Sequence, residues 1–346
     1  MTAPLADRLR LQATLCREAE SALTATLLDG AADDLDAGGP TAALLGPLEH
    51  DPAGSAPSLR LAGALHRLVL ERRAPALALH YPSVGGTVGD VWPVAREVIE
   101  DQREVLTELV ARPVQTNEVG RSSVLLGGLL HIAASTGLPI RLLEVGASGG
   151  LNLQFDRYAH EVADGVVLGD RDSPVRLRCP WQGSFPPLAA LEVVNRKGCD
   201  PAPLDPASTE DRLTLTSYVW ADQLERFERL RGALQVAADH PLMVERLPAS
   251  QFLSRELAEP MVGVATVVWH SVVRQYLAPQ ERADGTDILR QAGDRASALA
   301  PLAHLRLEPE RQGPDVSFLL SLTSWPGGVS RVLAQAQGHG PPVVWR

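Results

Sequence analysis

One pattern limits what this chain can fold into more than any other: a run of small residues directly after a short apolar segment. The apolar segment covers residues 139–145, and the small residues after it are Gly146, Ala147, Ser148, Gly149 and Gly150. Glycine permits a sharp turn and the close approach of a ligand, and free N–H groups at a helix start attract polar or negative atoms. The run therefore predicts a strand, a tight turn and a helix starting at Leu151, with a ligand at the turn.

Short apolar runs separated by helix-like stretches follow this turn. Strands are expected at residues 139–145, 191–195, 242–245, 262–269, 304–307, 316–322 and 343–345. Helices are expected at residues 151–158, 217–237 and 287–300, and a partly helix-like segment joins the last two strands. This alternation is typical of an α/β fold with a mostly parallel sheet, here of seven strands.

Before about residue 130 the apolar residues recur at helical spacing instead. One such set consists of Val94, Val98, Val105 and Leu109. The chain has 346 residues, more than one average domain. We expect a helical N-terminal domain over residues 1–114 that covers the substrate, and an α/β domain over residues 115–346.

The amino-acid composition limits which partners and which cellular compartment we expect. The formal net charge is −10, which disfavours nucleic acid and anionic membranes as general partners. No stretch reaches the roughly 18 uncharged apolar residues of a membrane span, and the start of the chain lacks the apolar core of a signal peptide. Cys16, Cys179 and Cys199 lie far apart without Cys-x-x-Cys spacing, so no metal site is expected. We expect a cytoplasmic protein with a small-molecule partner, and a homodimer stays open.

The residue before the turn separates classes of nucleotide cofactor. Glu144 lies at the expected carboxyl end of the first strand. A carboxylate there is favourable beside a cation or hydroxyl groups and unfavourable beside a pyrophosphate. A dinucleotide fingerprint reads Gly-x-Gly-x-x-Gly, with an acidic ribose ligand about 20 residues further on, and residues 146–150 do not fit it well. The turn therefore favours a cationic cofactor without phosphate.

The pattern Glu-x-Gly-x-Ser-x-Gly at residues 144–150 resembles the first motif of class I S-adenosylmethionine-dependent methyltransferases. The resemblance covers about residues 116–346 and implies a Rossmann-like fold with an antiparallel last strand, formed by pairing of residues 316–322 with 343–345. It also implies that S-adenosylmethionine contacts Glu144, the turn residues and Asn152.

Three strings resemble signatures of a narrower bacterial family of unknown function. They start at Gln115, Leu142 and Trp269 and read QTNEVGRSS, LLEVGASGGLNL and WHSVV. Membership would imply the same fold over the C-terminal half without naming a substrate.

In that architecture an acidic residue at the end of the second strand holds the ribose hydroxyls. Asp170 follows an apolar run at the usual distance from the glycines, whereas Asp200 follows the strand expected at 191–195 and requires an insertion before it. We favour Asp200, because residues 176–181 have the pattern of a hairpin insert. A solvated loop aspartate is an equally good interpretation of either residue.

Three further side chains are expected near the same sheet edge. His270 follows the fourth expected strand, and histidine can accept a proton from an attacking hydroxyl or amine near neutral pH. It is our candidate base, with a positioning role or an ordinary hydrogen bond as alternatives. Glu118 and Arg121 carry charges suited to the amino-acid part of the cofactor or to an acceptor. Alternatively, their segment caps a helix through Thr116 or Asn117.

These residues favour a methyltransferase that uses S-adenosylmethionine to modify an oxygen or nitrogen of a small molecule. An NAD-type oxidoreductase on a similar sheet is one alternative, and a non-catalytic cofactor-binding protein is another. The acceptor is not specified by the sequence.

Overall fold

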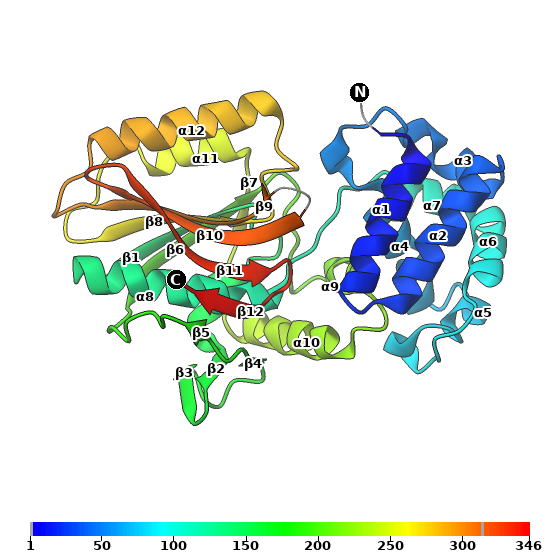
Figure 1. Cartoon of the computed structure of the whole chain (residues 1–346), viewed down its shortest axis with the longest axis horizontal. Coiled ribbons are helices and arrows are strands. Elements are labelled where there is room, and N and C mark those ends of the chain that lie inside the picture. The colour runs from blue at the N-terminus through cyan, green and yellow to red at the C-terminus, as the bar shows by residue number, and fades with distance from the viewer. Residues whose placement is uncertain (1–2, 313–314) are drawn as a thin grey trace. The chain divides into compact units, whose positions relative to one another are not determined.

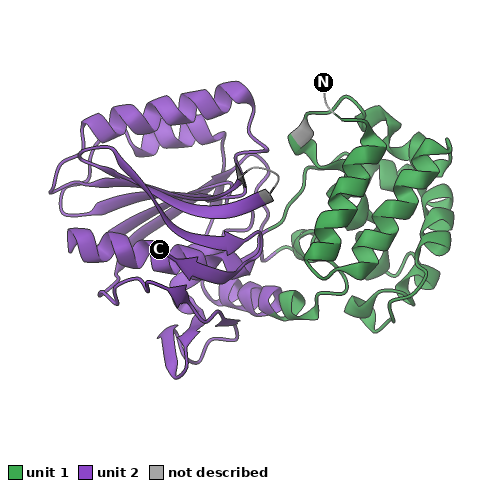
Figure 2. Ribbon diagram, viewed as in Figure 1, with its two compact units in different colours: residues 1–116, 208–228 green, residues 117–207, 229–346 purple. Residues whose placement is uncertain are grey.

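The computed structural model describes residues 3–312 and 315–346. The chain divides into two compact units, shown in Figure 2 and described one at a time below. Unit 1 consists of residues 1–116 and 208–228, and unit 2 of residues 117–207 and 229–346. The segment 208–228 thus comes from within the range for which the sequence predicts the second domain.

Unit 1 is built from helices. They are α1 (Leu5–Glu18), α2 (Ala22–Asp36), α3 (Pro40–Leu45), α4 (Pro57–Leu70), α5 (Pro75–Ala78), α6 (Trp92–Asp101), α7 (Arg103–Val110) and α9 (Thr209–Ser217), with short 3₁₀ turns between some of them. Their apolar faces form one core that includes Leu9, Leu28 and Leu65, all fully buried. The residues used to predict helical spacing lie on α6 and α7 and pack against this core.

The segment 208–228 is tied to unit 1 by polar contacts. The Asp222 carboxylate accepts hydrogen bonds from Ser21 Oγ at 2.6 Å and from the Leu23 N–H at 2.9 Å. Asp222 thereby satisfies an N–H group at the start of α2 that no residue within the helix can satisfy. The residue that caps this helix lies about 200 positions further along the chain, which no local pattern predicts.

Unit 2 contains a nine-stranded sheet in the order β5–β12–β11–β10–β9–β8–β1–β6–β7 (Figure 1). The strands are β1 (Ile140–Val145), β5 (Gln182–Gly183), β6 (Val193–Asp200), β7 (Val244–Arg246), β8 (Ala265–Ser271), β9 (Leu302–Gln312), β10 (Asp315–Trp325), β11 (Val329–Gln337) and β12 (Gly340–Trp345). Parallel pairing joins β7, β6, β1, β8 and β9, which confirms the predicted α/β class.

The number of strands differs from the predicted seven. Strands β9 to β12 form an antiparallel series, and the strand at residues 316–322 pairs with β11 instead of with residues 343–345. The segment Val329–Gln337 contains two Ala, two Gln, one Leu and one Arg, six of its nine residues, and these residue types favour a helix. Pairing with β10 on one side and β12 on the other imposes the strand, because tertiary context overrides a weak local propensity.

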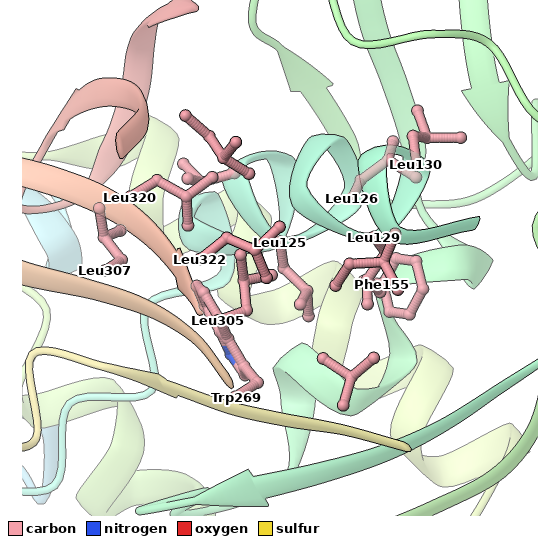
Figure 3. Close-up of a cluster of buried hydrophobic side chains, with 14 of the residues drawn as sticks. Leu125, Leu126, Leu129, Leu130, Phe155, Trp269, Leu305, Leu307, Leu320 and Leu322 are labelled. Atoms are coloured by element: carbon pink, nitrogen blue, oxygen red, sulfur yellow. The ribbon is translucent and has the colours of Figure 1, made fainter. Parts of the chain in front are cut away.

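Helices cover both faces of the parallel strands. Helix α8 (Ser122–Thr136) lies on one face, and α11 (Ala249–Glu256) and α12 (Pro279–Asp294) lie on the other (Figure 1). On the α8 face, Leu125 lies near Leu305 of the sheet and Leu129 lies beside Phe155, all of them fully buried (Figure 3). Helix α10 (Leu224–Asp239) contains the boundary between the two units.

An insert separates β1 from its neighbour β6. After a seven-residue 3₁₀ helix, η5 (Leu151–Arg157), comes a small sheet of β2 (Ala159–Ala163), β3 (Val166–Gly169) and β4 (Arg176–Arg178), in the order β3–β2–β4. The α-helix expected at 151–158 is therefore a 3₁₀ helix. After the insert, β5 joins the edge of the main sheet beside β12, and β6 then pairs in parallel with β1.

Candidate functional site

The glycine turn lies where the order of the parallel strands changes direction. The chain passes from β1 to β6 and β7 on one side, and later to β8 and β9 on the other side. The loops that follow β1 and β8 therefore lie on either side of a switch point at the carboxyl ends of the strands, which is where open α/β sheets bind ligands. The turn at residues 146–150 begins at this switch point.

Two backbone angles and one close contact explain why glycine is needed in the turn. Gly146 has a φ of +71° and Gly150 a φ of +70°, which disfavour any residue with a Cβ. A Cβ on Gly146 would lie 2.4 Å from Cγ2 of Val273, in the loop after β8. The loops that follow β1 and β8 thus pack directly against each other. The expected sharp turn is confirmed, and the group that closely approaches Gly146 is the Val273 side chain.

The N–H groups of the turn, however, are not free. Gly146 and Ala147 both donate to the carbonyl oxygen of Cys199, at 2.9 and 3.0 Å, and Gly150 donates to Ala147. The Ser148 N–H donates to Asp200 at 3.0 Å, and the Leu151 N–H donates to the side chain of Asn117 at 3.1 Å. The prediction that free N–H groups at this helix start would attract ligand atoms is therefore wrong for these five groups. Protein acceptors occupy the donors that a phosphate would need.

The structure separates the two candidate aspartates. Asp200 ends β6 beside the turn, is 7% exposed, and accepts from the N–H groups of Ser148 at 3.0 Å and Ala202 at 2.8 Å. Asp170 follows β3 in the insert, is exposed, and accepts from the Asp172 N–H. Only Asp200 lies at the sheet edge, because the insert removes Asp170 from the main sheet.

Glu144 is a buried carboxyl next to this turn. It is 2% exposed, and burial raises its pKa to about 8, although the Trp269 indole and the charge of Arg121 oppose the rise. Trp269 is its partner in register on β8, on the same face of the sheet. Glu144 Oε2 and Trp269 Nε1 are nevertheless both buried without a hydrogen-bond partner. Unpaired buried polar atoms are costly, so their presence marks a place where a ligand can supply the missing partner.

Asn152 adds a further unpaired atom near the turn. It lies on η5, two residues after Gly150, is 2% exposed, and its Oδ1 has no hydrogen-bond partner. The turn itself is a continuous buried stretch from Ala147 to Gly150. The turn and Asn152 thus provide a carbonyl acceptor within the same short segment that begins at Glu144.

The segment with Glu118 and Arg121 joins several loops at this edge. Glu118 accepts from the Gly120 N–H at 3.0 Å and caps a 3₁₀ turn, Val119–Arg121. Asn117 does not cap its own helix, as the alternative prediction had it, but bonds to Leu151 of the glycine turn segment. Arg121 donates to Gly338 O at 2.8 Å and to Ser271 O at 3.2 Å, and its charge acts on Glu144. Arg121 therefore connects the start of α8 to the end of β8.

His270 forms a pair with a carboxylate that the sequence interpretation missed. His270 Nδ1 lies 2.7 Å from Oε1 of Glu308, which also accepts from the N–H groups of Val273 at 3.0 Å and Arg274 at 3.3 Å. No residue of the described ranges 3–312 and 315–346 is hydrogen-bonded to Nε2 of His270. The polar alternation His304, Arg306, Glu308 along one strand face was the available signal for Glu308.

The loop that carries these contacts has a strained backbone. Val272 has a φ of +54°, an unusual value for a β-branched residue, and its N–H donates to Leu307 O at 2.9 Å. Such strain costs about 1–3 kcal/mol and persists only where surrounding contacts enforce it. Here the Glu308 carboxylate holds the two following N–H groups, and Val273 packs on Gly146.

The part of the chain that the structure describes shows neither a metal site nor a membrane-spanning helix. No group of three or more His, Cys, Asp or Glu side chains in residues 3–312 and 315–346 could hold a metal ion. The three cysteines are free and buried. A search of those same residues for a helix long and apolar enough to cross a membrane finds none.

Comparisons with known proteins give one match. A family model described as an uncharacterized protein conserved in bacteria (DUF2332) matches residues 6–345. No curated protein and no solved structure matches the chain.

Proposed function

The chain belongs to the DUF2332 family, and we propose that its unit 2 binds S-adenosylmethionine at the glycine turn and transfers the methyl group to a small molecule. The observation that carries the proposal is Glu144, a carboxyl that is buried beside the turn with one oxygen unpartnered. A buried carboxyl is stable either with a proton or with a nearby cation. S-adenosylmethionine is a cation that carries no phosphate.

The sheet supports a Rossmann-like arrangement of this kind. The parallel strands follow the order β7–β6–β1–β8–β9, and the glycine turn follows the central one. Asp200 ends the neighbouring strand β6, where a carboxylate can accept hydroxyl hydrogen bonds of a ribose. Its two oxygens each accept one backbone N–H, so further lone pairs are available for hydroxyl groups.

The residues that would hold the cofactor are Glu144, Asn152 and Asp200 on the segments around the turn. Asn152 offers an unpartnered acceptor oxygen for an N–H group of the ligand. When bound, S-adenosylmethionine supplies an electrophilic methyl group. The chain's own contribution is to align the acceptor and exclude water, since displacement at a sulfonium methyl depends mainly on alignment.

His270 is suited to remove a proton from the acceptor. Glu308 accepts a hydrogen bond from Nδ1–H in the neutral ring, which leaves Nε2 as the proton acceptor. An oxygen or nitrogen acceptor that is protonated at neutral pH needs such a base.

The NAD-type alternative fits these residues less well. A pyrophosphate would lie beside the buried Glu144 carboxyl, and five N–H groups of the turn already donate to protein acceptors. Both features oppose an anion at this place.

Calorimetric titration of the protein with S-adenosylmethionine, S-adenosylhomocysteine and NADH tests the proposal. We expect binding of both sulfur ligands and none of NADH. Glu144→Gln should lower the affinity for S-adenosylmethionine at least tenfold, because this ligand is a cation. It should lower the affinity for S-adenosylhomocysteine, an uncharged thioether, by less.

Glu192→Gln is the matched control, because it makes the same chemical change at an exposed residue just before β6, at the opposite end of the sheet. It should leave both affinities unchanged. Absence of binding of either sulfur ligand at high micromolar concentration would refute the proposal.

A further inference from the structure

A group of basic side chains lies on the face of the sheet opposite to Glu144, where the carboxyl end of β8 pairs with β9. His270 follows Trp269 directly, so its side chain points to the other face. Its partner in register on β9 is Arg306, and the two therefore lie side by side. His304 lies two residues before Arg306 on the same face, and its ring centroid is 5.0 Å from that of His270.

The Glu308 carboxylate lies on the same face of β9, and one of its oxygens already accepts three hydrogen bonds. Glu308 is 5% exposed, and its Oε1 accepts from His270 Nδ1 and from the N–H groups of Val273 and Arg274. Neither the Arg306 nor the Arg274 guanidinium forms an ion pair or a side-chain hydrogen bond with any other residue in the described ranges 3–312 and 315–346. Two arginines beside His270 thus lack a counter-charge.

Other arginines that are largely withdrawn from solvent do have one. Arg60 meets Asp51 at 3.0 Å, and Arg196 meets Asp156 at 2.7 Å through two nitrogens. Arg141, which is 7% exposed, pairs with Glu256. Arg306 is half-buried like Arg196 but has no such partner.

The electrostatics of His304 show the resulting excess of positive charge. Its pKa lies well below the ordinary value, first because it is buried, and then because of the charges of His270 in its protonated form, of Arg306 and of Arg274. All three charges act on the same ring. An anion placed among them would be stabilised by each of them.

We propose that Arg306 and Arg274 bind the carboxylate of a small ligand, which is thereby held against His270. A guanidinium presents a planar fork that matches a carboxylate, and Arg274 is exposed on the loop after β8, where it can close on a ligand. The inference rests on the proposed function in one respect only: there, the bound carboxylate belongs to the methyl acceptor. The acceptor class is then a hydroxy or amino acid whose O–H or N–H faces Nε2 of His270.

Sodium acetate is the simplest probe, because it is a carboxylate with no other recognition group. Imidazole resonances of His270, assigned from their loss in His270→Gln, are followed by NMR while acetate is added, with sodium chloride at equal ionic strength as the reference. We expect a saturable shift with half-saturation in the millimolar range, and only a small linear drift with chloride.

Arg306→Gln and Arg274→Gln should each raise the half-saturation concentration about tenfold, and the double variant should abolish saturation. Arg274→Gln changes an exposed side chain, so it remains informative if Arg306→Gln fails to fold. Arg178→Gln, at a residue whose side chain is 83% exposed in the insert, should behave like the unaltered protein.

A shift that does not saturate, or that is identical in Arg274→Gln, would overturn the proposal. The measurement needs no S-adenosylmethionine. Acetate binding without cofactor binding would therefore refute methyl transfer while supporting the anion site, and the reverse result would refute the anion site alone.

Discussion

His270 Nδ1 lies 2.7 Å from Oε1 of Glu308, although 38 residues separate them in the sequence. The same oxygen holds the N–H groups of Val273 and Arg274, and Val273 in turn packs on Gly146. One carboxylate thus fixes both the orientation of the candidate base and the loop that contacts the glycine turn.

Glu308→Gln should destabilise the protein at pH 7 by about 2 kcal/mol, because a buried carboxylate that accepts three hydrogen bonds is replaced by an amide. Burial opposes ionisation of Glu308, but the hydrogen bond from His270 and the two N–H groups hold its pKa below the ordinary 4.5. A lowered pKa stabilises the fold above pH 4.5, and this stabilisation is lost as the pH falls through the lower, folded-state pKa. Urea unfolding should therefore show the difference at pH 7 and a smaller one below pH 4.5; a constant difference would contradict the assigned role.

Glu144→Gln should have the opposite pH dependence in the absence of ligand. Burial raises the Glu144 pKa from 4.5 to about 8, so the native state retains a proton that the unfolded chain has lost. The free energy of unfolding then falls as the pH rises from about 5 to 8. The variant lacks this group and should be more stable than the unaltered protein by about 4 kcal/mol at pH 8 and by less than about 1 kcal/mol at pH 5. Parallel stability curves in urea would show that Glu144 is ionised in the native state.

Gly146→Ala should destabilise much more than Gly137→Ala. Both glycines have positive φ, +71° and +65°, but a Cβ on Gly137 meets nothing within 4 Å, whereas one on Gly146 lies 2.4 Å from Val273. Gly137→Ala is the control. It measures only the cost of a positive φ at a residue with a Cβ, about 1 kcal/mol. The additional cost at Gly146 should be about 2 kcal/mol by thermal or urea unfolding, because the loop after β8 must move. Equal losses of unfolding free energy in the two variants would mean that Val273 can move away from the new Cβ at no cost.

Asp200→Asn and Asp170→Asn distinguish the two predicted ribose ligands. The amide of Asn can accept one N–H but opposes the second with its own donor, so Asp200→Asn should cost about 1–3 kcal/mol of stability. It should also weaken S-adenosylmethionine in the titration described above. Asp170 is exposed and accepts one local N–H, so Asp170→Asn should change stability by less than about 0.5 kcal/mol and leave the affinity unaltered. Equal effects of the two substitutions would remove the basis for choosing Asp200.

The local sequence pattern was sufficient to predict the strand at 140–145, the sharp turn at Gly146 and the helices α6 and α7. A buried strand needs a run of apolar residues, and a positive φ needs a residue without a Cβ, so both leave direct marks in the sequence. The sequence favoured Asp200 over Asp170 without deciding between them, and the hairpin expected at residues 176–181 is instead the strand β4, which pairs in parallel with β2. The strand β11 could not be predicted, because its composition favours a helix and only its pairing with two neighbouring strands imposes the strand.

What the sequence by itself determined is the α/β class, the glycine turn and the acidic residue before it, because these depend on neighbours within a few positions. Only the tertiary structure decided which polar groups meet. The N–H groups of the turn were taken by Cys199, Asp200 and Asn117, Glu308 was paired with His270, and Arg306 was placed beside that histidine without a carboxylate partner. These relationships join residues about 34 to 53 positions apart in the chain. They are set by sheet order and strand register, to which no local run of residues is sensitive.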